Sequence, residues 1–251
     1  MNEHLTQDAP GTQSHPVAQT KTFNPGAGLA MVAGLAAAGV LTSKMARAVS
    51  PPLRFADIPG TGNIKVLNFA LALEDLETEL YFQAIDRLTD GGTGGRDRPP
   101  GLQITGLGIG ESQRDVKFTR KFTTVEREHR DFLRAAITAA GGPVIQPFKY
   151  DFGINRLSRR QVVELVFTAE KTGVAAYLGA IPFFANKDFL GVAAAIQGTE
   201  ARHTAIFADV INDLFGTPLE VAPTARMNGG RDQPLTPDAV LAAVSPFIIV
   251  S

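Results

Sequence analysis

The 251-residue chain contains no cysteine, and only four histidines and three tyrosines. Without cysteine it can form no disulfide, thiolate zinc site or iron–sulfur cluster and has no cysteine nucleophile, so any metal ion would be held by His, Asp or Glu. Excess charge of one sign is also missing, because 24 basic and 25 acidic residues give a net charge of −1. We therefore expect no nucleic-acid partner.

The N-terminal region has little that could build a folded domain. Residues 1–22 are polar and lack apolar periodicity, so we interpret them as a tail. Residues 23–43 carry no charge, and Lys44 and the triplet Ala46-Arg47-Ala48 follow them. This outline is typical of a signal peptide, here residues 23–48, and predicts an exported, periplasmic or extracellular protein with a mature chain beginning near Val49.

Two other interpretations of the uncharged segment stay open. At about 20 residues it is long enough to span a bilayer, so an uncleaved chain would touch a membrane through residues 23–43 and be anchored there. An Ala- and Gly-rich core or interface helix is the third alternative.

The rest of the chain predicts helices. A linker rich in proline and glycine is followed by apolar residues with helical periodicity and by long connections, of which the loop at 89–110 is rich in glycine and proline. Ser158 is expected to cap the third helix. No useful strand-like alternation appears, so we predict an all-α four-helix bundle over 49–221, with a long crossover connection and a C-terminal extension, 222–251, that packs along the bundle or against a neighbour. The expected helices are about 64–88, 111–140, 158–181 and 187–215.

An α-helix advances by 100° per residue, and when the sequence is projected on this basis several acidic residues fall on the apolar faces of the expected helices. On the first helix Glu74, Glu77 and Tyr81 are expected to face inward, and Asp75 and Glu79 outward. On the second helix the inner stripe is expected to contain His129 and to have Glu126 on its edge, the two forming Glu-x-x-His. The apolar members expected in that stripe are Phe118, Phe122, Val125, Phe132 and Ala136.

The third and fourth helices repeat this pattern. Glu170 is predicted at the centre of an apolar arc, and so is Glu200, with His203 one turn later in a second Glu-x-x-His. A buried ionised carboxylate must be neutralised, paired or bound to a metal. Because no lysine or arginine occupies the centres of these arcs, a divalent metal cluster accounts for all four helices at once. One Glu-x-x-His alone would fit an exposed helix face equally well.

The few histidines and tyrosines are placed in the same way. Both histidines beyond the N-terminal tail belong to the Glu-x-x-His pairs. Tyr81 and Tyr177 each follow an inward glutamate by seven residues, two turns along the same face. Each hydroxyl could donate a hydrogen bond to a ligating carboxylate in the opposite half of the bundle, although ordinary core aromatics would show the same spacing.

On these motifs the sequence resembles the ferritin-like superfamily, whose bundles carry Glu-x6-Tyr on the first and third helices and Glu-x-x-His on the second and fourth. Leu-Asn-Phe-Ala-Leu-x-Leu-Glu-x-Leu-Glu at 67–77 and Gly-Val-x-Ala-Tyr-Leu-Gly-Ala at 173–180 resemble the ferritin-like domain of desiccation-related and exported bacterial proteins. The resemblance covers about 60–217. It implies a set of six metal ligands, of which Glu126 and Glu200 would bridge two ions: Glu74, Glu126, His129, Glu170, Glu200 and His203. Glu77 departs from the family pattern, but because it is expected to face the core it could be a seventh, alternative ligand or a hydrogen-bond partner.

Carboxylates combined with histidines suit iron or manganese better than calcium, and these ligand types leave zinc open as well. We therefore expect two iron ions, with manganese as the alternative, and an oxidoreductase acting on O2 or peroxide. By resemblance, its setting would be oxidative or desiccation stress. A metal-binding or storage module and a structural stress protein without turnover are the alternatives, and the sequence leaves assembly into a homo-oligomer open.

Overall fold

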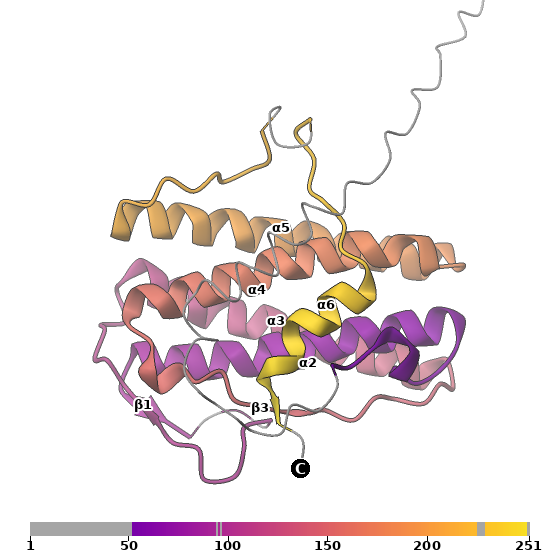
Figure 1. The fold of residues 1–251 in the computed structure, drawn as a ribbon, viewed down its shortest axis with the longest axis horizontal. Helices are drawn as coiled ribbons and strands as arrows, with labels where there is room; N and C mark the ends of the chain where they lie inside the picture. Colours follow the sequence, from indigo (N-terminus) through magenta and orange to yellow (C-terminus); the bar gives the residue numbers. More distant parts are fainter. Residues whose placement is uncertain (1–51, 94, 96, 225–228, 250–251) are drawn as a thin grey trace, which may run out of the picture.

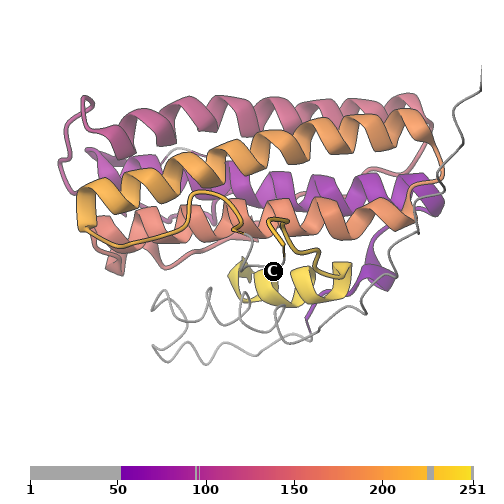
Figure 2. The same cartoon turned by 90° about the horizontal axis from the view of Figure 1, so that it is seen from above.

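The computed structural model describes residues 52–93, 95, 97–224 and 229–249 (Figure 1). Its four long helices are α2 (Gly62–Leu88), α3 (Arg114–Ala139), α4 (Arg159–Ala180) and α5 (Lys187–Phe215), and the view from above shows them side by side as a bundle (Figure 2). The all-α prediction is confirmed. The tail and the segment expected to be a signal peptide or an anchor lie outside the described residues. Among the described helices, none combines the length and apolarity that a membrane span requires.

The helix ends follow from local sequence. Ser158 caps α4 as expected: its side chain accepts a hydrogen bond from the backbone N–H of Gln161, whose own side chain accepts one from the Ser158 N–H. Asn186 caps α5 through its side-chain oxygen, which accepts from the backbone N–H groups of Asp188 and Phe189, and α5 ends at Gly216 in the left-handed conformation. The observed bounds of α5 are those expected from the sequence.

The connection between α3 and α4 is the crossover, and it runs along α2. At its start the Asn68 side chain donates to the carbonyl of Pro143, and at its end the Arg87 guanidinium donates to the carbonyl of Leu157. Asn68 and Arg87 stand near opposite ends of α2. The crossover therefore spans most of the bundle's length and brings α4 in antiparallel to α2, because the end of α4 leads to Ala185, whose N–H donates to Asn63.

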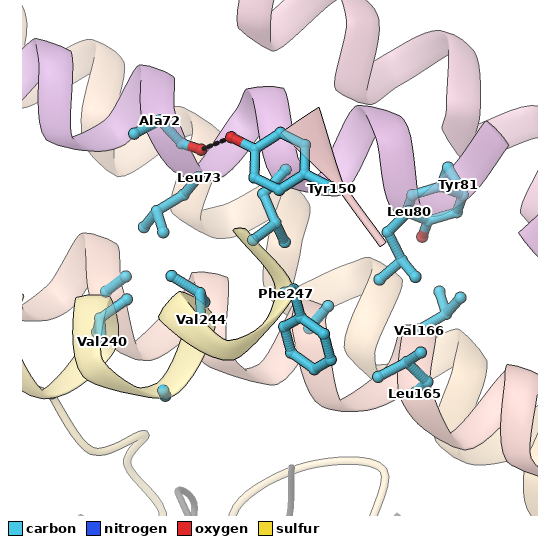
Figure 3. Close-up of a cluster of buried hydrophobic side chains, with 14 of the residues drawn as sticks. Ala72, Leu73, Leu80, Tyr81, Tyr150, Leu165, Val166, Val240, Val244 and Phe247 are labelled. Carbon is cyan, nitrogen blue, oxygen red and sulfur yellow. Dashed lines mark hydrogen bonds between the residues drawn. The ribbon is translucent and has the colours of Figure 1, made fainter. Parts of the chain in front are cut away.

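The C-terminal extension packs on the bundle. It contains α6 (Pro237–Val244), η5 (Ser245–Phe247) and the two-residue strand β4 (Ile248–Ile249), which pairs antiparallel with β3 (Lys149–Tyr150) of the crossover. Gly179 allows the close approach, since a Cβ there would lie 1.7 Å from the carbonyl oxygen of Leu235. Figure 3 shows Val240, Val244 and Phe247 of this extension among buried side chains of α2 and α4.

Short elements hold the remaining connections. In the loop between α2 and α3, β1 (Gly91–Gly92) pairs antiparallel with β2 (Ile104–Thr105). Three further one-turn 3₁₀ helices stand at the ends of connections: η2 (Phe55–Asp57), η3 (Ile154–Arg156) and η4 (Ile181–Phe183). No strand among the described residues exceeds two residues, as the lack of alternation predicted.

Two expectations about α2 are wrong. Asp75 and Glu79 do not face outward; they are 0% and 1% exposed. Asp75 is paired with Arg134 of α3 at 2.9 Å, and Glu79 accepts hydrogen bonds from Gln83 and from the Asp97 N–H of the loop between α2 and α3. The α3 arginine and this loop cover faces of α2 that single-helix periodicity assigned to solvent.

The orientation of α3 also differs from the expectation. Phe132, expected in the inner stripe, is 48% exposed, whereas Glu126, expected on its edge, is fully buried. Two threonines take part in the true stripe. Thr119 and Thr123 are buried, and the Thr123 hydroxyl donates to the carbonyl of Thr119 one turn earlier. The expected stripe was drawn through apolar residues alone, and it was therefore rotated about the helix axis, toward Phe132 and away from the face that is buried. That face contains Glu126 and the two threonines.

Candidate metal centre

Four glutamates meet at the middle of the bundle, one from each long helix: Glu74 on α2, Glu126 on α3, Glu170 on α4 and Glu200 on α5. All four are 0% exposed. The histidines accompany them, with the side chain of His203 4% exposed and that of His129 13% exposed. The structure thus brings together all six residues of the expected ligand set.

Their donor atoms form two overlapping groups. Glu74, Glu126, His129 and Glu200 each offer one atom in a set that lies within 4.8 Å of one another. The second group, equally compact, consists of Glu126, Glu170, Glu200 and His203. Glu126 and Glu200 belong to both groups, so they occupy the positions that two bridging carboxylates would need.

The histidine nitrogens face these carboxylates. His129 Nδ1 lies 3.1 Å from Glu126 Oε2 and 3.3 Å from Glu200 Oε1. His203 Nδ1 lies 2.8 Å from Glu126 Oε1 and 3.3 Å from Glu170 Oε2. Each nitrogen therefore points into its own group of oxygens, in the orientation that a shared cation between nitrogen and oxygen requires.

Two tyrosines tie the halves of the bundle together. Tyr81 on α2 donates its hydroxyl to Glu170 on α4, and Tyr177 on α4 donates to Glu74 Oε1 on α2 at 2.5 Å. Both rings are buried, and burial raises the pKa of each hydroxyl well above its ordinary value. The hydroxyls therefore stay protonated and fix one oxygen of each glutamate, leaving the other oxygen turned to the cluster.

Several buried cluster atoms make no hydrogen bond of ordinary geometry among the described residues, although some of them lie within ion-pair distance of a histidine nitrogen. These atoms are the following: Glu74 Oε2, Glu126 Oε1, Glu170 Oε2, Glu200 Oε1 and Oε2, and His203 Nδ1. Orphaned buried acceptors are costly and rare in folded proteins. Divalent cations would satisfy them together, so the residues present fit a metal cluster.

No arginine forms a described ion pair with the four central glutamates. Within the part of the chain that the structure describes, the ion pairs of the four glutamates are made with His129 and His203. Arg127 and Arg202, which lie next to cluster residues in sequence, are exposed as expected. Lys171, beside Glu170, is half-buried, and Arg130, beside His129, is buried and paired with Asp131. The central carboxylates are therefore unlike Asp75, which has an arginine partner.

The pKa values of the cluster without metal reflect burial and crowding of like charges. Burial, together with the charge of Glu200, raises the pKa of Glu126 to about 7, although the two histidines oppose the rise. Burial also raises the pKa of Glu200 well above its usual range. For His203, burial acts to lower the pKa, but its close contacts with the Glu126 and Glu170 carboxylates raise it to about 10. Such a site holds protons that a bound cation would displace.

Glu77 lies beside the cluster without joining either group. It is 3% exposed and its Oε2 has no hydrogen-bond partner among the described residues. Gly173 makes room for it, since a Cβ there would lie 3.0 Å from Glu77 Oε1 and 3.1 Å from Glu200 Oε2. Gly173 is a residue whose role at the site was not expected from the sequence.

Phe122 is a second such residue. Its ring stacks on the imidazole of His203, with centroids 3.8 Å apart and planes 20° apart. This contact restricts the rotation of the ring whose Nδ1 faces Glu126. The signal in the sequence was its position one turn before Glu126 on α3, but it was assigned only to the core.

The fold and the site define a four-helix bundle with a central carboxylate–histidine cluster. A family profile described as a ferritin-like domain matches residues 62–213, more than half of the chain, and the chain belongs to this family. No curated protein matches the sequence. Family and cluster together establish a ferritin-like metal-binding protein, and the expectation drawn from the motifs is confirmed at that level.

Proposed function

We propose that the protein binds two divalent iron ions, with manganese as the alternative, and is an oxidoreductase that reduces O2 or peroxide under oxidative or desiccation stress. The observation that carries this proposal is the pair of overlapping donor groups that share Glu126 and Glu200. Each group supplies three carboxylates and one imidazole. The proposal extends to an exported protein, which mass measurement of the native chain tests: a start near Val49 supports export, and an intact Met1 in the soluble cytoplasmic fraction contradicts it.

The donor chemistry favours a transition metal over calcium or magnesium. Calcium and magnesium are bound through oxygen, whereas imidazole suits iron and similar metals. Both histidines aim a ring nitrogen at carboxylates of their own group. The six residues Glu74, Glu126, His129, Glu170, Glu200 and His203 would hold the ions, and Glu77 is the candidate for a seventh ligand.

Two iron(II) ions would supply two electrons, which with two protons reduce O2 to hydrogen peroxide, or hydrogen peroxide to two waters. The chain's own residues prepare the site for this. Tyr81 and Tyr177 hold one oxygen of Glu170 and Glu74, so each carboxylate keeps a fixed direction. Phe122 holds the imidazole of His203. The buried helices exclude bulk water from the four central carboxylates.

Anaerobic titration with Fe(II) tests the ligand assignment. We expect the wild type to bind about two ions per chain, the number held by this bundle pattern. Glu170→Ala should lower the stoichiometry or the affinity, because Glu170 belongs to one donor group. Glu164→Ala is the matched control on the same helix, where the carboxylate pairs with Arg160. Unchanged binding of two ions by folded Glu170→Ala would overturn the assignment.

Reaction with oxidants tests turnover. The iron(II)-loaded wild type should consume O2 or peroxide, and His203→Ala should suppress the reaction because one ion loses its nitrogen donor. If the fully loaded wild type consumes neither oxidant, the oxidoreductase proposal fails, and the storage or structural alternatives replace it.

A further inference from the structure

A small cavity of about 20 Å³ lies between α2 and α4, beneath the C-terminal extension. This is roughly the space that one water-sized molecule needs. Most of its lining is apolar, and Figure 3 shows several of these side chains from α2, α4 and the extension around one space. Of the lining residues, Figure 3 labels Leu73, Leu80, Leu165, Val244 and Phe247.

The inner end of this cavity adjoins the metal centre. Glu77 and Gly173 line it, and both lie against the cluster. A Cβ on Gly173 would lie 3.1 Å from Glu200 Oε2. Because glycine has no side chain, the backbone of this part of the wall lies close to a carboxylate that both donor groups share. An apolar molecule in the cavity would therefore be within one side chain's length of the cluster.

The lining selects against polar occupants. A buried water requires two to four polar partners, and peroxide must likewise replace the hydrogen bonds it makes in water. Of the polar lining residues, Thr172 already donates its hydroxyl to the carbonyl of Thr168, which leaves the Glu77 carboxyl as the main partner. Apolar cavities of this kind stay dry and take up apolar atoms such as xenon.

The opposite side of the cluster has a different character. His129 on α3 is its most exposed member, at 13% of the side chain. The cluster therefore comes nearest to solvent on the side of His129, whereas the side between α2 and α4 is apolar and covered by Val244 and Phe247.

We propose that the cavity under α6 is a binding site for dioxygen and delivers it to the metal centre, which makes O2 the oxidant that this chain is built to admit. This inference rests on the proposed function. It assigns to the C-terminal extension a role in forming the site, since two residues of the extension build part of the cavity wall.

Xenon binding to the metal-free protein tests the cavity without any activity measurement. The chemical shift of ¹²⁹Xe should report one saturable site in the wild type, and Val244→Phe should abolish it by filling the space. Val244→Ala should enlarge the site and retain binding. Val221→Phe makes the same change as the filling variant at a position 48% exposed and should leave xenon binding intact. A wild type without a xenon site would overturn the inference.

Oxidation kinetics of the iron(II)-loaded protein test delivery. Val244→Phe should slow oxidation by O2 while oxidation by peroxide and the number of bound ions stay unchanged. The smaller Val244→Leu provides a second filling variant if the phenylalanine prevents α6 from docking, as followed by circular dichroism. Equal rates with O2 in the filled and wild-type proteins would refute delivery alone. A wild type that binds metal but reacts with no oxidant would instead refute the proposed function, and oxygen delivery with it.

Discussion

Replacing Tyr177 with phenylalanine removes one hydroxyl at the boundary of the metal centre. This hydroxyl donates to Glu74 Oε1 at 2.5 Å, and Glu74 is 0% exposed, so no solvent can replace the lost donor. A hydrogen bond to a charged group contributes about 1.5–3 kcal/mol. Loss of a group that orients a metal ligand typically lowers metal affinity by about 10–100-fold. We expect Tyr177→Phe to bind the same number of ions with an affinity lower by that factor.

Competition titration with a chromophoric chelator measures this change, using Mn(II) or Co(II) to avoid oxidation. Tyr150→Phe is the matched control, because Tyr150 is equally buried but its hydroxyl donates at 3.4 Å to the carbonyl of Ala72, away from the donor groups. The control should lower the melting temperature without changing metal affinity. If both variants lose affinity alike, or Tyr177→Phe loses none, the tyrosine acts only in packing and the reasoning is refuted.

Two further predictions concern other buried charges. Asp75→Ala should lower the free energy of unfolding by about 3 kcal/mol, because it strands Arg134, yet leave metal stoichiometry unchanged in the same titration. The metal-free protein should melt at a lower temperature as pH rises from 5 to 9. The folded state raises the pKa of Glu126 to about 7 and that of His203 to about 10, so both residues hold protons more tightly in the folded than in the unfolded chain. Their contribution to stability is therefore present at low pH and is lost as pH rises through these values. Added Mn(II) should stabilise progressively more over the same range, since binding displaces those protons; a metal-free melting temperature that rises with pH would contradict this sign.

The fold was accessible from sequence because its determinants are local. Helical periodicity marked each long helix, Ser158 marked the start of α4, and the observed helix starts differ from the expected ones by at most three residues. The six cluster residues were accessible for a related reason. Spacings of three and seven residues keep side chains on one helix face, so an inward glutamate carries its histidine or tyrosine with it.

The sequence could not show which faces of a helix are buried by segments distant from it along the chain. α2 is buried nearly all round, since the crossover lies along it and the loop between α2 and α3 reaches Glu79. Periodicity assumes one buried and one exposed face, and therefore placed Asp75 and Glu79 in solvent. On α3 the buried Thr123 satisfies its hydroxyl within the helix by donating to the carbonyl of Thr119, which allows this polar residue to occupy a buried stripe.

The distribution of arginine separates two kinds of buried carboxylate in this molecule. Asp75 has Arg134, Glu79 has Arg98, and Asp115 has Arg159 at 2.7 Å. The chain thus places a guanidinium beside these carboxylates, which stabilises their charge without any cofactor.

The four central glutamates differ, because their described ion pairs are made with two histidines. Even if both imidazoles are protonated, two positive charges face four carboxylates. Part of the cluster must then hold protons, as the raised pKa values of Glu126 and Glu200 indicate, or accept further cations. Two divalent ions would supply the four positive charges that balance four carboxylates with neutral histidines, and this charge balance supports metal binding independently of the family relationship.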